Sequence, residues 1–219
     1  MSDAARQAHW QSVYTIKSEA QTSWYRPHLD HSLRLIDSLH LAAAAPVLDV
    51  GGGRATLVDD LLARGHTDVG VLDLAAAALD AARQRMGAAG VQVRWLCADI
   101  LEADLPAAHY ALWHDRAVFH FLIDAAARDA YVARAAHAVR AGGHAIIATF
   151  AADGPERCSG LPVMRYAATA LATCFAPHFE CIADNREEHH TAAGATQPFT
   201  YVLLHRRGGT AIVTESASC

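Results

Sequence analysis

The sequence predicts an α/β fold: a doubly wound, mostly parallel seven-stranded sheet with helices on both faces and a C-terminal antiparallel hairpin. Three observations lead to this prediction. Apolar runs alternate with helical stretches between residues 46 and 150. Glycines directly follow the first apolar run. Near the C-terminus, a short polar link joins two strand-like runs, as in a hairpin.

The expected elements follow one another at regular spacing. A helical preface covers the first 40 residues, with apolar residues at helical spacing over 32–39 and a turn or lid at 23–27. Strands are expected at 46–50, 69–74, 91–97, 110–115 and 144–150. Helices are expected at 55–63, 75–86, 128–139 and 163–174, and the hairpin at 179–187 and 199–206.

Composition excludes several classes of protein. The formal net charge of −5 is opposite to the basic surface that nucleic-acid binding needs. No apolar run reaches the roughly 18 residues of a membrane span, so no membrane partner is expected. The five cysteines contain no CxxC pair, and the first residues are polar. These features favour a cytoplasmic protein with reduced thiols, and they leave its oligomeric state open.

Three acidic residues fall at or just after the carboxyl ends of successive predicted strands, where doubly wound sheets bind ligands. They are Asp49, before the glycines at 51–53, Asp73 and Asp99. A dinucleotide site would have a further glycine where Thr56 stands. S-adenosylmethionine fits better: its amino group suits Asp49, its ribose Asp73 and its adenine amino group Asp99.

Four segments together carry a family resemblance: VLDVGGG at 47–53, VLDL at 71–74, CADI at 97–100 and VRAGG at 139–143. Their order and spacing resemble the Rossmann-like class I S-adenosylmethionine-dependent methyltransferases. Ala141 stands where the family usually has proline, a mild departure. The segments WHDRAVFHFL and GPERCSGLP are similar to those of an uncharacterised, mainly bacterial subgroup. The resemblance implies that S-adenosylmethionine is bound by Asp49, Gly51, Gly52, Gly53, Asp73, Leu74, Asp99, Ile100 and His114.

The 219 residues and 53% hydrophobic content suit one domain. We divide it into an N-terminal helical lid (1–44), a cofactor-binding core (46–150), an acceptor-side loop, helix and edge hairpin (151–207) and a loose tail (208–219). A dehydrogenase-like or inactive scaffold is the alternative. A second alternative is a non-catalytic S-adenosylmethionine-binding or interaction protein, against which the intact cofactor acids argue.

Five residues are candidates for catalysis on the acceptor side. Asp115 and His120 are plausible bases, although Asp115 also suits a helix N-cap and His120 a core position between two phenylalanines. Arg116 suits either a clamp for a substrate carboxylate or a structural ion pair. Cys158 could be a nucleophile, a metal ligand or an inert residue, and His189 could act as a base.

The sequence contains 14 histidines, and two of them raise the possibility of a metal site. His120, Cys158 and His189 come from three loops that this fold could bring together. Such a set could bind Zn²⁺ or another divalent metal and activate a soft acceptor. The rival is a metal-free pocket in which His120 or His189 acts as base.

The methyl acceptor is not specified by any motif. A small molecule is the leading interpretation, with Trp24, Tyr25 and Phe150 as candidate substrate contacts. The alternative is a protein lysine methyltransferase, because the Ser23-Trp24-Tyr25 entry is similar to that of some lysine methyltransferases acting on translation factors. Aromatic rings there could cage an ammonium group.

Overall fold

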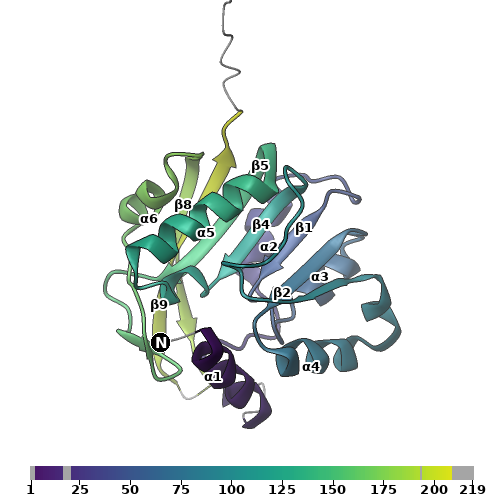
Figure 1. Cartoon of the computed structure of the whole chain (residues 1–219), viewed down its shortest axis with the longest axis vertical. Helices are drawn as coiled ribbons and strands as arrows, with labels where there is room; N and C mark the ends of the chain where they lie inside the picture. The colour runs from purple at the N-terminus through teal and green to yellow at the C-terminus, as the bar shows by residue number, and fades with distance from the viewer. Residues whose placement is uncertain (1–2, 17–20, 193, 209–219) are drawn as a thin grey trace, which may run out of the picture.

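A computed structural model describes residues 3–16, 21–192 and 194–208 (Figure 1). Seven strands form one sheet in the order β3-β2-β1-β4-β5-β9-β8. Their bounds are β1 (Val47–Val50), β2 (Val69–Asp73), β3 (Arg94–Cys97), β4 (Tyr110–Arg116), β5 (Val139–Phe150), β8 (Phe179–His190) and β9 (Thr196–Arg206). Strands β1 to β5 are parallel, and β9 and β8 form an antiparallel hairpin against β5. The predicted fold class is confirmed.

Helices cover both faces of this sheet. Their bounds are α1 (Asp3–Ile16), α2 (Asp30–Ser38), α3 (Leu57–Ala63), α4 (Ala76–Met86), α5 (Ala125–Ala138) and α6 (Ala168–Phe175), with 3₁₀ turns η2 (Gly87–Gln92) and η3 (Phe119–Phe121). Helices α2, α3 and α4 pack into one hydrophobic cluster, and α5 and α6 into the other. Helix α1 lies below the sheet in Figure 1 and contacts the start of α4.

Alternation along β4 decides which layer each of its side chains enters. Trp113 faces α5, where its indole donates to the Tyr131 hydroxyl at 2.9 Å. His114 faces α2, where its Nε2 lies 2.8 Å from Ser32 Oγ. Asp115 therefore lies on the α5 side of the sheet and Arg116 on the α2 side.

Residues 139–143 begin a strand, whereas the sequence predicts a helix up to residue 139 and a strand only from residue 144. Helix α5 ends at Ala138, and β5 begins at Val139, which pairs with Tyr110 before an irregularity in the register. Gly142 has a φ of +74°, which glycine adopts without strain inside this irregular stretch. Gly142 and Gly143, which follow the predicted helix, thus lie in the first part of a longer strand.

The region after β5 also differs from expectation. Two short strands, β6 (Arg157–Cys158) and β7 (Leu161–Pro162), form a separate antiparallel pair, so α6 begins at Ala168 and not near residue 163. Turn η2 likewise delays β3 to Arg94. Within the described ranges no helix has the length and apolarity that a membrane crossing requires. The tail expected over 208–219 falls, from residue 209 on, outside the described residues.

Candidate active site

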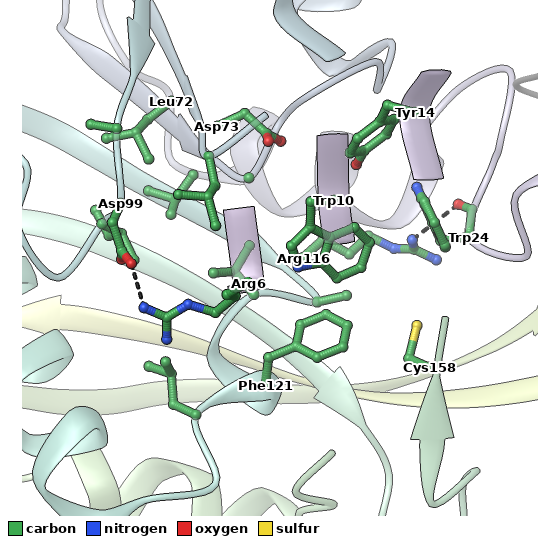
Figure 2. A pocket seen from close by; sticks show the side chains of 18 residues that line it. Arg6, Trp10, Tyr14, Trp24, Leu72, Asp73, Asp99, Arg116, Phe121 and Cys158 are labelled. Carbon is green, nitrogen blue, oxygen red and sulfur yellow. Dashed lines mark hydrogen bonds and ion pairs between the residues drawn. The ribbon is translucent and has the colours of Figure 1, made fainter. Parts of the chain in front are cut away.

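A cavity of about 120 Å³ opens at the carboxyl ends of the parallel strands (Figure 2). Asp73 and Asp99 lie at one side of it, Trp24, Phe121 and Cys158 at the other, and Trp10 lies between them. It is lined by Arg6, Trp10, Tyr14, Trp24, Val50, Gly51, Leu72, Asp73, Leu74, Ala98, Asp99, Ile100, Arg116, Ala117, Val118, Phe121, Leu122 and Cys158. Segments far apart in the sequence therefore enclose one space.

The glycine turn after β1 forms the floor of this site. Gly51 has a φ of +67°, and a Cβ there would overlap the Val118 side chain. A Cβ on Gly52 would overlap the Asp49 carboxylate, and one on Gly53 would lie 2.7 Å from Asp73 Oδ2. The glycines are needed because the backbone approaches both acids closely.

The second acid, Asp73, is 6% exposed. Its Oδ1 accepts a hydrogen bond from the Ala75 backbone at 2.8 Å. Burial, with a contribution from Asp49, raises the pKa of Asp73 to about 7. A ligand hydroxyl that donates to this carboxylate would favour its ionised form.

The third acid, Asp99, already has a partner within the protein. Its Oδ2 pairs with the Arg6 guanidinium of α1, and its Oδ1 accepts from the Leu101 backbone at 2.9 Å. Gln7 and Gln11 also hydrogen-bond the segment after β2 and the start of α4, at Leu74 O and Ala77 N. Helix α1 therefore lies across the site as a lid.

The first acid, Asp49, belongs to a buried hydrogen-bonded chain. Its Oδ1 lies 2.7 Å from His114 Nδ1, and the other ring nitrogen of His114 contacts Ser32. Ser32 also hydrogen-bonds Tyr201. Asp49 Oδ2 is buried and lacks a hydrogen-bond partner in the described structure, so one carboxylate oxygen is available to a ligand.

A smaller cavity adjoins the larger one and holds a second unpartnered group. Arg54, directly after the glycines, contributes to its wall together with Asp49 and His114. The Nε and Nη2 atoms of Arg54 are buried without a hydrogen-bond partner among the described residues, and its guanidinium lies 5.0 Å from the Tyr14 ring centroid. An acid and a cation, each with an unused hydrogen-bonding atom, thus line one small space.

Our sequence reasoning missed Arg54 and the contribution of α1. Arg6, Trp10 and Tyr14 all line the larger cavity. They follow one another at intervals of four residues, a spacing that places side chains on one face of a helix and could have identified them. Arg54 carried a weaker signal, its position next to the glycine turn.

The side chains of the two candidate bases, on β4 and η3, point into the protein interior. Asp115 is fully buried and accepts from the backbone of Val118 and Phe119 and from Tyr131. Burial raises its pKa to about 6. His120 packs against aromatic rings, and burial, followed by the Arg116 charge, lowers its pKa to about 3. Neither residue lines the two cavities. Their environments favour the capping and core interpretations.

Arg116 lines both cavities and is anchored from behind. Its Nε donates to Tyr201 at 3.0 Å and its Nη1 to the Trp24 carbonyl at 3.3 Å, while Nη2 lies 3.5 Å from Glu187 Oε2. Burial raises the pKa of Glu187, but Arg116 and then Tyr201 outweigh it and hold that pKa below its usual value. The ion pair of the structural interpretation is therefore present.

The metal site that we expected from His120, Cys158 and His189 is not assembled. No group of three or more histidine, cysteine, aspartate or glutamate side chains in the described part of the chain could hold a metal ion. His189 Nε2 donates to the Ser23 carbonyl at 2.6 Å, which ties β8 to the segment before α2, and the Phe150 backbone approaches His120 Nδ1. His120 Nε2 and His189 Nδ1 have no hydrogen-bond partner in the described structure, but the two side chains and Cys158 do not come together as a ligand group.

The candidate substrate contacts separate into two groups. Trp24 lines both cavities and Tyr25 the smaller one, as expected of the entry segment. Phe150 lines neither, because it is buried between His120 and Phe199. Phe121 and Trp10 take the place at the cavity wall that the sequence suggested for Phe150.

Comparison with known proteins places this site in a family. Residues 47–143 match the family model described as a methyltransferase domain. The match contains the glycine turn and all three acids. The chain therefore contains a methyltransferase domain over these residues. No curated protein matches the sequence significantly.

Solved structures share this methyltransferase's fold over most of its length. One, from a study of the conversion of a disulfide bond into a thioacetal group during echinomycin biosynthesis, has a TM-score of 0.74 at 18% identity and covers 94% of each chain. The Burkholderia thailandensis 1,6-didemethyltoxoflavin-N1-methyltransferase has a TM-score of 0.70 at 22% identity, covering 94% of this chain and 88% of its own. The Bradyrhizobium japonicum N-methyltransferase NodS has a TM-score of 0.65 at 17% identity, covering 82% of this chain and 86% of its own. At these identities the likeness concerns the fold.

The Burkholderia thailandensis and Bradyrhizobium japonicum structures both contain S-adenosylhomocysteine. The residues that the sequence suggested for S-adenosylmethionine lie together at one edge of the sheet. Asp73, Leu74, Asp99 and Ile100 line the larger cavity, and Asp49, Gly52 and His114 the smaller one, while Gly51 borders both.

Proposed function

We propose that this methyltransferase transfers the methyl group of S-adenosylmethionine to a small molecule. The supporting observation is the enclosure of the larger cavity by side chains from separate elements, among them Trp10 of α1 and Cys158 of the β6–β7 hairpin. The adenosine part of the cofactor shares this cavity of about 120 Å³, so the space left for the acceptor suits a compact molecule.

The unpartnered groups of the smaller cavity fit the two charges at the methionine end of the cofactor. Asp49 Oδ2 would accept from its ammonium group, and Arg54 would donate to its carboxylate. Asp73 would accept from the ribose hydroxyls and Asp99 from the adenine amino group. When bound, the cofactor supplies an electrophilic methyl group on a sulfonium sulfur.

Protein residues have two tasks in this reaction. The walls hold the acceptor in line with the methyl group, which is where most of the rate enhancement of a simple displacement arises. Arg6 must leave Asp99 before an adenine amino group can take its place, so α1 would open for the cofactor and close again over it. Water would then be excluded from the reacting atoms.

A protein lysine acceptor is the weaker candidate. Trp10 and Trp24 could stack on an ammonium group, but the Arg116 guanidinium is part of the same wall and would repel it. The only carboxylates that line the larger cavity in the described structure, those of Asp73 and Asp99, lie at its cofactor side.

Two measurements test this proposal. Calorimetry with S-adenosylhomocysteine should show binding that Arg54→Met weakens by about ten-fold or more, while adenosine, which lacks the methionine part, binds both proteins alike. Equal loss of adenosine binding would contradict the role of Arg54.

Incubation with cell lysate and methyl-labelled cofactor tests the acceptor. Label should enter the small-molecule fraction in the presence of the enzyme, and a heat-inactivated sample is the control. Label recovered only in protein would refute the small-molecule proposal.

A further inference from the structure

Three aromatic rings form the acceptor side of the larger cavity, and they come from three separate segments. Trp10 lies on α1, Trp24 before α2 and Phe121 at the end of η3. The ring centroid of Trp10 lies 5.9 Å from that of Trp24 and 5.0 Å from that of Phe121. In both pairs the ring planes meet at an angle of 76°. Edge-to-face contacts of this kind stabilise one arrangement of the rings, so they form a preorganised apolar wall.

The charged group at this wall is the Arg116 guanidinium. Its side chain is 5% exposed, and hydrogen bonds to Tyr201 and to the Trp24 carbonyl fix its orientation. Its Nη2 is buried without a hydrogen-bond partner in the described chain, although Glu187 lies 3.5 Å away. The wall therefore offers a guanidinium that Glu187 pairs from behind and whose Nη2 has no hydrogen bond in the described chain.

A proton acceptor is missing from the same side among the residues that the structure describes there. The labelled lining residues away from Asp73 and Asp99 in Figure 2 are Trp10, Tyr14, Trp24, Arg116, Phe121 and Cys158, and none of them carries a carboxylate or an imidazole. Asp115 and His120 point into the protein interior, where they contact other residues. A protonated amine would meet a repelling charge and have no base to take its proton.

On the basis of the proposed function, we infer that the acceptor is a planar aromatic or heteroaromatic molecule whose acidic nucleophile reacts as its anion. Heteroaryl thiols, phenols and acidic ring N–H groups share this chemistry. The rings of Trp10 and Phe121 would hold the plane of the molecule, and Arg116 would stabilise the anion.

The transfer step balances without a base from the protein. The acidic proton goes to solvent when the anion forms, because such groups ionise readily beside a guanidinium. A lone pair of the anion then forms the new bond to the methyl carbon. The carbon–sulfur bond breaks with its electron pair remaining on the sulfur, so that a neutral methylated product and a neutral thioether result.

Matched probe acceptors test the inference. Thiophenol is planar and acidic, cyclohexanethiol has a similar size without the planar ring, and benzylamine has the ring with an ammonium group. We expect kcat/KM for thiophenol to exceed that for cyclohexanethiol by about ten-fold, with no turnover of benzylamine. A phenol and an acidic N-heterocycle, as further arms, identify the preferred atom. Preference for benzylamine would overturn the inference.

Failure of the inference and failure of the proposed function have different signatures. If no aromatic probe is methylated while label still enters another small molecule of the lysate, the inference is overturned and the proposed function stands. If label enters only protein, both are overturned.

Variants add readouts that a purely structural role would not change. Trp10→Leu should raise KM for thiophenol by about ten-fold, while Trp95→Leu, on β3 outside both cavities, serves as the matched control. Arg116→Gln should move the ionisation seen in the pH profile of kcat/KM upward, and Arg116→Lys should restore it. An unchanged KM in Trp10→Leu, or an unchanged profile in a folded Arg116→Gln protein, would overturn the assignment.

Discussion

Replacing Asp73 by asparagine tests how the cofactor acid at the end of β2 works. The change keeps an oxygen that can accept the 2.8 Å hydrogen bond from Ala75, so the local backbone should be preserved. It removes the negative charge that burial, followed by Asp49, makes costly in the cofactor-free protein. Asp73→Asn therefore separates the charge of this residue from its structural role.

The magnitude follows from the charge and the pKa. Losing charge-assisted hydrogen bonds from the ribose should weaken S-adenosylhomocysteine binding by about 1.5–3 kcal/mol, or about ten- to a hundred-fold, above pH 7. Because the pKa of Asp73 is raised to about 7 in the free protein, binding at lower pH must first expel a proton. At pH 6 about 0.4–0.8 proton should be released per cofactor bound, because a ten- to hundred-fold preference for the ionised form lowers the pKa of Asp73 by about one to two units in the complex.

Calorimetry in buffers of different ionisation enthalpy counts these protons. Wild-type affinity should rise by about ten- to a hundred-fold in total from acidic pH to above pH 7 and then level off, whereas the affinity of Asp73→Asn should stay flat over this range. Equal affinities above pH 7, or equal proton release by both proteins, would refute the reasoning.

Unfolding of the cofactor-free protein gives a second readout. The folded pKa of Asp73, about 7, lies above its unfolded value of 3.8. Its contribution to stability is therefore fully present below about pH 4 and is lost as the pH rises to about 7 and above. The stability of the wild type relative to Asp73→Asn should fall across that window.

Three further substitutions test other parts of the site. Arg6→Gln removes the group that competes for Asp99, so calorimetry at low salt should show S-adenosylhomocysteine binding several-fold more tightly, and weaker binding would show that Arg6 supports the cofactor instead. Asp115→Ala leaves buried donors unpaired and should lower the free energy of unfolding in urea by about 3 kcal/mol, with little change in cofactor affinity. Unchanged stability with a large loss of cofactor affinity would instead indicate a direct role for this residue. Ser32→Ala leaves His114 Nε2 without its partner and should lower the free energy of unfolding by about 1–3 kcal/mol, whereas Ser32→Thr should lower it less. Equal stability of Ser32→Ala and wild type would contradict the buried hydrogen-bonded chain.

Much of the cofactor side could be predicted from the sequence because its signals are local. Asp49, Asp73 and Asp99 each follow or end an apolar run, and parallel strands bring their carboxyl ends to one edge. The glycine turn between them is equally local, since its backbone has to approach two of these acids. Helix and strand ends were less predictable: glycine at 142 and 143 suits both a helix C-cap and an irregular strand.

The acceptor side depended on the tertiary structure. Period-two alternation along β4 put Asp115 toward α5 and Arg116 toward the cavity, but only the packed helices showed which face was which. His120 and Cys158 bear chemically versatile groups, and neighbouring strands decided that they and His189 do not form a metal site. The sequence alone thus determined the fold class and the cofactor acids, which depend on neighbours along the chain. Three features depend on segments that are distant in the sequence, so only the tertiary structure could show them. They are the aromatic wall around Trp10, the Arg6–Asp99 ion pair and the buried Arg54 nitrogens without a hydrogen-bond partner among the described residues.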